Sequence, residues 1–157
     1  MRRSTGEPYD VVIDTSTLFS ALYNRKGNEA FLFELADIGM GRIHLLDYVL
    51  DELTIVLARK GMAMDQVKDL LGAYDNLFVH EMEDLGEEEV QLAWEHVSHV
   101  EDRPVFLFAR RMMRGEKNVF FISGDKGFFR PAVVRLLDGR VMRTRAFIEM
   151  VSRGLSN

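Results

Sequence analysis

The stretch FFISGDKGF, residues 120–128, decides how this chain is interpreted. It begins with three consecutive apolar residues, a pattern typical of a strand buried on both faces. Ser123, Gly124 and Asp125 follow at once, so a hydroxyl, a flexible backbone and a carboxylate stand at the end of a buried strand. The pattern raises the question of what a carboxylate does there, and the rest of the chain supplies the context.

Composition sets the outer limits. The chain has 157 residues, 47% of them hydrophobic and 29% charged, which predicts one globular domain over residues 1–157 with a flexible start at 1–8. Cysteine is absent, which excludes disulfides and thiolate metal sites and fits a reducing compartment. No stretch has the length and apolar character of a membrane span, so we expect a soluble, cytoplasmic protein without membrane contact.

Charge is distributed unevenly along the chain. Residues 64–101 hold eleven acidic residues and one lysine, whereas residues 102–157 hold twelve Lys and Arg against five acidic residues. A basic half on an acidic protein of net charge −5 permits a polyanion to bind on one side, although two solvated faces of different charge explain the pattern equally well.

Short apolar runs alternate with helical patterns. We expect Asn28, Asp47 and Thr144 to cap helices. Such alternation predicts an α/β fold, a three-layer α/β/α sandwich with a mostly parallel central sheet, in which ligands bind outside the carboxyl ends of the strands. The expected strands are residues 9–14, 42–46, 77–82, 118–122 and 140–144, and the expected helices are 15–23, 28–39, 47–61, 65–74, 86–100, 103–115, 130–137 and 145–154.

Four acidic residues fall where such a sheet builds sites. Asp14 and Asp125 end strands, and Glu52 lies about a quarter turn from the apolar stripe of its helix, whereas Asp51 points nearly away from it. Asp102 precedes a helix that starts with a proline. Each acid alone has a structural explanation: a helix cap for Asp14 or Asp102, an ordinary surface glutamate for Glu52, a turn for Asp125. Only their joint placement indicates a site.

The four segments that carry these acids, VVIDTSTLFSAL, YVLDELTIVLAR, EDRPVFLFA and FFISGDKGF, resemble the acidic blocks of the PIN-domain nucleases in order and spacing. The resemblance extends from Asp10 to about Met150 and is strongest to the small single-domain toxins of VapBC-type pairs. It implies the same α/β/α sandwich, a bound Mg²⁺ or Mn²⁺, and hydrolysis of RNA. By position the catalytic residues and metal ligands would be Asp14, Glu52, Asp102 and Asp125.

Thr15, Ser16 and Ser123 would support these ligands. Two positions depart from the family pattern: Ser16 stands where family members usually have Asn, and Gly127 where many have an acid. The pair Glu101–Asp102 leaves open which carboxylate does the work.

The chemistry suits such a set of residues. In-line attack on a phosphodiester builds negative charge that divalent ions neutralise, and Mg²⁺ prefers carboxylate oxygens and waters. We expect RNA phosphates to contact Arg110, Arg114, Lys126 and Arg130. An antitoxin protein and a second copy of the chain are the protein partners to consider, and the competing function is an inactive PIN-like module for RNA binding or assembly.

The histidines suggest little else. His96 and His99 are spaced so that they could share a zinc ion, but no third candidate ligand has the sequence spacing typical of a zinc site. His44 and His80 fall in strand patterns, and we expect them to be hydrogen-bonded structural residues.

Overall fold

The architecture is that of a computed structural model, which describes residues 6–156. Five strands form one sheet in the order β3-β2-β1-β4-β5, and every neighbouring pair is parallel. This confirms the predicted α/β fold and makes the sheet wholly parallel. The strands are β1 (Tyr9–Ile13), β2 (Gly41–Leu46), β3 (Leu77–His80), β4 (Val119–Ile122) and β5 (Val141–Met142).

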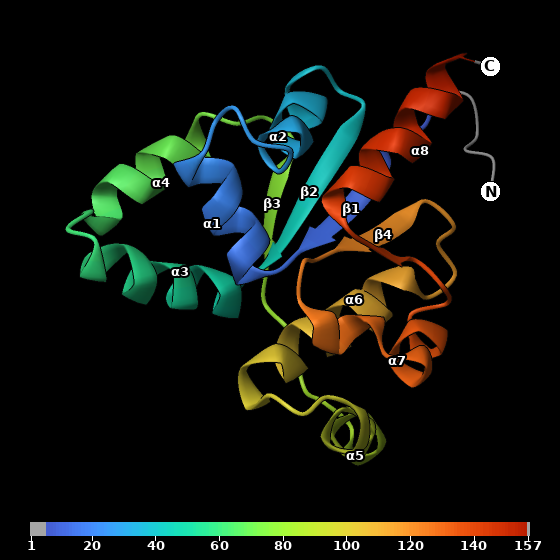
Figure 1. Ribbon diagram of the computed structural model, residues 1–157. Helices are drawn as coiled ribbons and strands as arrows, with labels where there is room; N and C mark the ends of the chain where they lie inside the picture. The colour runs from blue at the N-terminus through green and yellow to red at the C-terminus, as the bar shows by residue number, and fades with distance from the viewer. Residues whose placement is uncertain (1–5, 157) are drawn as a thin grey trace.

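Helices connect the strands and cover both faces of the sheet (Figure 1). One face carries Tyr9 and Phe120, which pack against Phe147 of α8. The opposite face carries Phe121, which packs edge-on against Phe128. The helices are α1 (Thr15–Tyr23), α2 (Ala30–Asp37), α3 (Asp47–Arg59), α4 (Met64–Gly72), α5 (Glu87–His96), α6 (Arg103–Met113), α7 (Pro131–Leu136) and α8 (Thr144–Ser156), with two 3₁₀ turns, η1 (Val100–Asp102) and η2 (Lys126–Phe129).

The expected helix over 86–100 is interrupted. α5 ends at His96, and Val97 already has extended backbone angles, φ −113° and ψ 109°. The guanidinium of Arg103 donates a 2.8 Å hydrogen bond from Nε to the Val97 carbonyl. This bond fixes the extended backbone at Val97 against the start of α6.

Three predicted helix caps are wrong. α2 is preceded by Glu29, without a side-chain cap, instead of by Asn28. Asp47 is the first residue of α3 and not its cap; its Oδ1 accepts the neighbouring Tyr48 amide at 2.8 Å. Thr144, expected as a cap, is likewise the first residue of α8. Sequence places such residues near a helix start, but a one-residue shift changes which groups they reach.

The structural role predicted for two histidines is confirmed. His44 Nε2 lies 2.7 Å from Asp10 Oδ1, and its Nδ1 lies 2.8 Å from His80 Nε2. Arg42 completes the group with two bonds to the Asp10 carboxylate at 2.7 and 2.8 Å. Burial acts to raise the pKa of Asp10, but the hydrogen bonds and charges of His44 and Arg42 outweigh it and lower the pKa. The Asp10 carboxylate therefore stays ionised within a row of polar contacts across β1, β2 and β3.

The predicted flexible start at 1–8 lies mostly outside the described residues, although Glu7 accepts a 3.2 Å bond from the Asn118 amide. None of the helices within residues 6–156 is both long enough and apolar enough to span a bilayer.

Part of the basic half is structural. Arg140 is buried, with its guanidinium bonded to the carbonyls of Glu116 and of Met113, the latter at 3.1 Å. It thereby ties the end of α6 to the start of β5. The charge of this residue is consequently unavailable to a polyanion, even though it contributes to the local positive balance.

We expect Arg140→Met to lower the free energy of unfolding by about 2–3 kcal/mol, because the buried Met113 carbonyl and the partly buried Glu116 carbonyl would lose a charged donor. Arg145, which is exposed on α8, provides the matched control. Arg145→Met should change the free energy of unfolding by less than about 0.5 kcal/mol. Urea denaturation of the three proteins measures both values. Equal stability of Arg140→Met and wild type would contradict the structural role.

Candidate functional site

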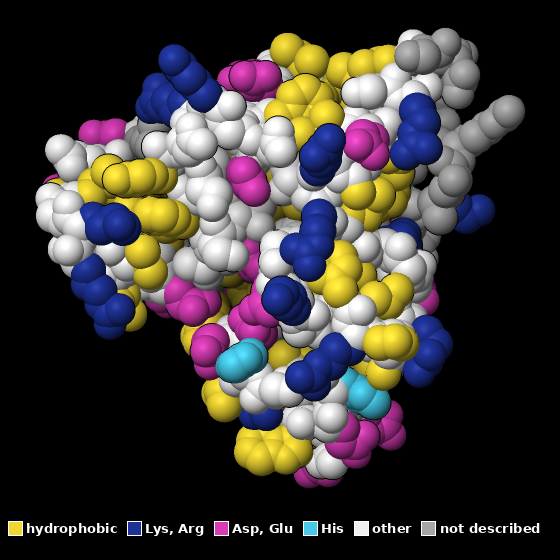
Figure 2. All heavy atoms as spheres, in the orientation of Figure 1, with side chains coloured by type: hydrophobic (Ala, Val, Ile, Leu, Met, Phe, Trp, Pro, Cys, Tyr) yellow, Lys and Arg dark blue, Asp and Glu magenta, His cyan; other side chains and the backbone are white. Residues whose placement is uncertain are grey.

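One cavity at the carboxyl edge of the sheet collects the four predicted acids. Asp14 follows β1 and Asp125 follows β4, and these two strands are hydrogen-bonded neighbours. Glu52 reaches the cavity from α3, and Asp102 from the 3₁₀ turn before α6. Figure 2 shows acidic side chains gathered in the hollow between the α1–α3 side and the α6–α7 side of the molecule. The parallel sheet therefore brings together residues that lie more than a hundred positions apart.

Asp14 is held by three donors. It is only 6% exposed, and its Oδ1 accepts the Thr17 amide at 2.9 Å and the Ser16 hydroxyl at 3.3 Å. The Ser123 hydroxyl donates to the other oxygen, Oδ2. Asp14 thus caps α1, which is the structural role considered for it from the sequence, and at the same time it lines the cavity. The two roles are compatible because a carboxylate accepts several hydrogen bonds.

Ser123 links the two strand-end acids. Besides donating to Asp14, its Oγ accepts the amide of Asp125 at 3.1 Å. Asp125 in turn accepts the Gly127 amide at 2.8 Å through Oδ1, which caps the turn η2. The hydroxyl noted at the end of the buried strand therefore fixes the spacing between the two carboxylates.

Glu52 is positioned by Thr15. The threonine hydroxyl donates to Glu52 Oε1 at 2.8 Å, across α1 and α3. The neighbouring Asp51 is exposed, as the helical geometry predicted. Burial raises the pKa of Glu52, and the charges of Glu101 and Asp14 add to the rise against the lowering effect of the Thr15 bond.

Asp102 carries the strongest perturbation of the site. It makes no capping hydrogen bond to α6, so the cap explanation fails for this residue. Burial raises its pKa to about 7, and the Asp125 charge, a hydrogen bond to Asp125, and the charges of Glu101 and Asp14 contribute in that order. Burial and the neighbouring carboxylates therefore both disfavour the ionised form of Asp102 in this cavity.

Glu101, which the sequence left as an alternative to Asp102, also lines the cavity. It is exposed, whereas Asp102 is half-buried beside Asp125. The geometry favours Asp102 as the inner residue and Glu101 as a charge at the rim.

The donor set suits a hard divalent cation, although no cage is preformed. Within residues 6–156 no three Asp, Glu or His side chains converge closely enough to enclose a metal ion. The same finding means that a zinc ion shared by His96 and His99 would have no third protein ligand among these residues. Mg²⁺ keeps several waters and requires few carboxylates, so four oxygen donors around a water-filled cavity fit its chemistry.

Comparison with known proteins agrees with this geometry. Residues 11–132 match the family model described as PIN domain. The chain belongs to the PIN domain family. PIN domains are generally nucleases that act on nucleic acid, and they typically bind divalent metal ions. A search among curated proteins found no significant match.

The four predicted RNA-binding cations of this PIN domain lie in two places. Lys126 and Arg130 line a second pocket, which shares Asp102 and Asp125 with the acidic cavity. Arg110 and Arg114 lie at the far end of α6 from Asp102, and Arg110 Nε is engaged by the Leu136 carbonyl at 3.1 Å. RNA binding by all four remains a prediction, but the geometry favours the first pair.

Sequence reasoning missed the second pocket itself. Ser98 and His99 line it because α5 ends at His96 and not at residue 100. Trp94 offered no signal, because it lies at helical spacing from Val90 and Val97 and yet is 65% exposed.

The raised pKa of Asp102 makes the stability of the metal-free protein depend on pH. A carboxyl group whose pKa is raised by folding stabilises the folded state while protonated, and this contribution is lost as the pH rises from about 4 toward about 7. Between pH 5 and 7.5, we expect wild type to lose about 1–2 kcal/mol more unfolding free energy than Asp102→Asn, after allowing for solvent screening.

Urea denaturation in EDTA at the two pH values measures this difference. The lowered pKa of His80, caused by burial and the charge of His44, has the opposite pH dependence but is present in both proteins and cancels. An equal loss in both proteins would show that Asp102 is not under electrostatic strain.

Proposed function

We propose that this PIN domain is a divalent-metal-dependent endoribonuclease, with Asp14, Glu52, Asp102 and Asp125 as metal ligands. The observation that carries the proposal is the convergence of these four carboxylates on one cavity at the carboxyl edge of the sheet. Burial raises the pKa of Asp102 and of Glu52, and the charges of the neighbouring acids add to both rises. A divalent cation relieves this charge, and the family typically binds one.

The chain's own residues prepare the site for that chemistry. Ser123 orients Asp14 and the backbone of Asp125, and Thr15 orients Glu52, so the ligands are held before any ion arrives. A bound Mg²⁺ or Mn²⁺ would neutralise charge on the scissile phosphate and lower the pKa of a water molecule. Asp102 must release its proton to act as a ligand, which makes metal affinity rise with pH near neutrality.

The biological setting that we propose is that of a toxin in a toxin–antitoxin pair, because the acidic blocks are most similar to those small single-domain nucleases. Its partner would then be an antitoxin protein. The proposal is also compatible with a homodimer of this chain.

A non-catalytic PIN-like module that binds RNA or organises an assembly is the competing function. The four cavity acids argue against it, because a module that only binds RNA gains nothing from carboxylates that repel phosphates. Cleavage measurements separate the two functions directly.

We expect purified protein to cleave labelled single-stranded RNA with Mn²⁺ or Mg²⁺ and to be inactive in excess EDTA. Asp14→Asn and Asp125→Asn should each reduce the rate by at least about 100-fold, because each removes a charged ligand. Asp51→Asn is the matched control: it removes an exposed acid next to Glu52 and should leave the rate unchanged. Undiminished cleavage in EDTA would refute metal dependence, and RNA binding without cleavage would favour the non-catalytic module.

A further inference from the structure

The second pocket combines cations with the inner acids. Its lining includes Ser98 and His99 from the segment after α5, and Lys126 and Arg130 from η2 and the loop behind it. Asp102 and Asp125 also line it, so it opens directly beside the acidic cavity. A strand whose scissile phosphate lies at the acids would place a neighbouring nucleotide here.

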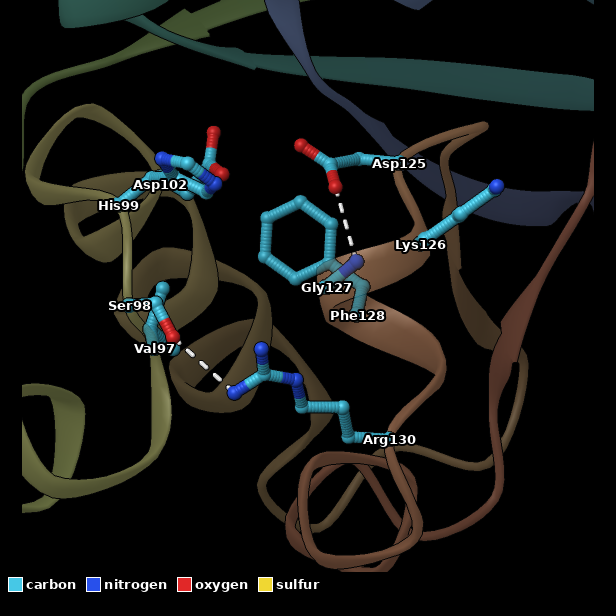
Figure 3. Close-up of a pocket in the computed structure, with 9 residues that line it drawn as sticks. All are labelled: Val97, Ser98, His99, Asp102, Asp125, Lys126, Gly127, Phe128 and Arg130. Carbon is cyan, nitrogen blue, oxygen red and sulfur yellow. Dashed lines mark hydrogen bonds between the residues drawn. The ribbon is translucent and has the colours of Figure 1, made fainter.

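The pocket has a defined floor and rim (Figure 3). Phe128 lies in its centre, 1% exposed and packed on Phe121, which makes the floor rigid. The Arg130 guanidinium extends toward Ser98 and donates to its hydroxyl at 3.0 Å, whereas Lys126 points away from the centre toward the outside. Arg130 therefore provides a hydrogen-bonded cation inside the pocket, and Lys126 provides a cation at its edge.

An exposed aromatic ring adjoins this pocket. The Trp94 indole is 65% exposed, and the Arg103 guanidinium lies over one face of it, 4.2 Å from the ring centroid. Arg103 is itself held by the Val97 carbonyl, which belongs to the pocket lining, and directly follows Asp102 in the chain. One side of the ring is thus fixed against a cation, while most of its surface faces solvent.

Most of the Trp94 ring stays in water apart from its contact with Arg103. Burial of an indole is strongly favourable, and an exposed one beside a basic pocket is typical of a surface that stacks bases. Phosphates would follow Arg130 and Lys126, which line the pocket.

We propose that Trp94 and this pocket form a nucleotide subsite for single-stranded RNA. The Trp94 ring stacks on an unpaired base, and Arg130, His99 and Lys126 contact the adjacent phosphate. The subsite rests on the proposed function, because the neighbouring acids define where the scissile phosphate lies. It explains a preference for single strands, since a base paired within a duplex cannot stack on a protein ring.

Trp94 is the only tryptophan of the chain, so its fluorescence reports on the subsite directly. Titration of the full chain with hexauridylate, in EDTA and again with Mn²⁺, should quench the emission. An abasic oligonucleotide of the same length and charge should not quench it. Binding of labelled hexauridylate, followed by anisotropy, should weaken about tenfold in Trp94→Leu, the usual effect of losing one base–aromatic stack.

Two further variants test the phosphate contacts. Arg130→Ala should weaken binding and reduce the slope of log affinity against log salt by roughly one, and Lys117→Ala, an exposed cation remote from the pocket, should leave both unchanged. Tyr23→Leu removes an equally exposed aromatic on α1 and should bind hexauridylate as wild type does.

Unquenched Trp94 emission in both buffers, or wild-type affinity in Trp94→Leu, would overturn the subsite and leave Trp94 as a contact for another protein. Cleavage is scored separately on the same proteins. A wild type that cleaves RNA without a Trp94 response refutes the subsite alone, whereas a Trp94 response without metal-dependent cleavage supports the subsite and refutes the nuclease proposal.

Discussion

The Ser123 hydroxyl connects the sheet to the acidic cavity. It donates to Asp14 and accepts the backbone amide of Asp125, and so it joins the ends of β1 and β4, where two of the cavity acids stand. The buried strand before it fixes this hydroxyl in space. The rest of the site depends on this link, because like-charged carboxylates repel each other and this link keeps Asp14 next to the segment that carries Asp125.

The fold could be predicted from sequence because its signals are local and repeated. Apolar runs that alternate with helical patterns give a parallel sheet regardless of the exact ends of each element. The errors lie at those ends. The helix expected over 86–100 stops at His96, and the extended backbone that follows is held by a bond from Arg103, a tertiary contact that local helix propensity does not encode.

The site could be predicted only in part. The position of Glu52, and not Asp51, follows from the angle between residues on a helix. The choice between Glu101 and Asp102 cannot be predicted in this way, because it depends on which carboxyl group is buried beside Asp125. The same holds for the basic residues: local charge suggested Arg110 as readily as Arg130, but the Arg110 guanidinium is bonded to a backbone carbonyl.

Thermal melts test the central claim, that the four carboxylates form one strained set relieved by a divalent cation. Without metal, Asp125→Asn should melt about 2–4 °C above wild type, because it removes one charge from the set and retains an oxygen for the Gly127 amide. Added Mn²⁺ should raise the melting temperature of wild type, and Asp125→Asn should lose most of this increase. Asp51→Asn should behave as wild type. If Asp125→Asn melts lower than wild type without metal and still shows the full Mn²⁺ shift, Asp125 serves only the turn and the account is wrong.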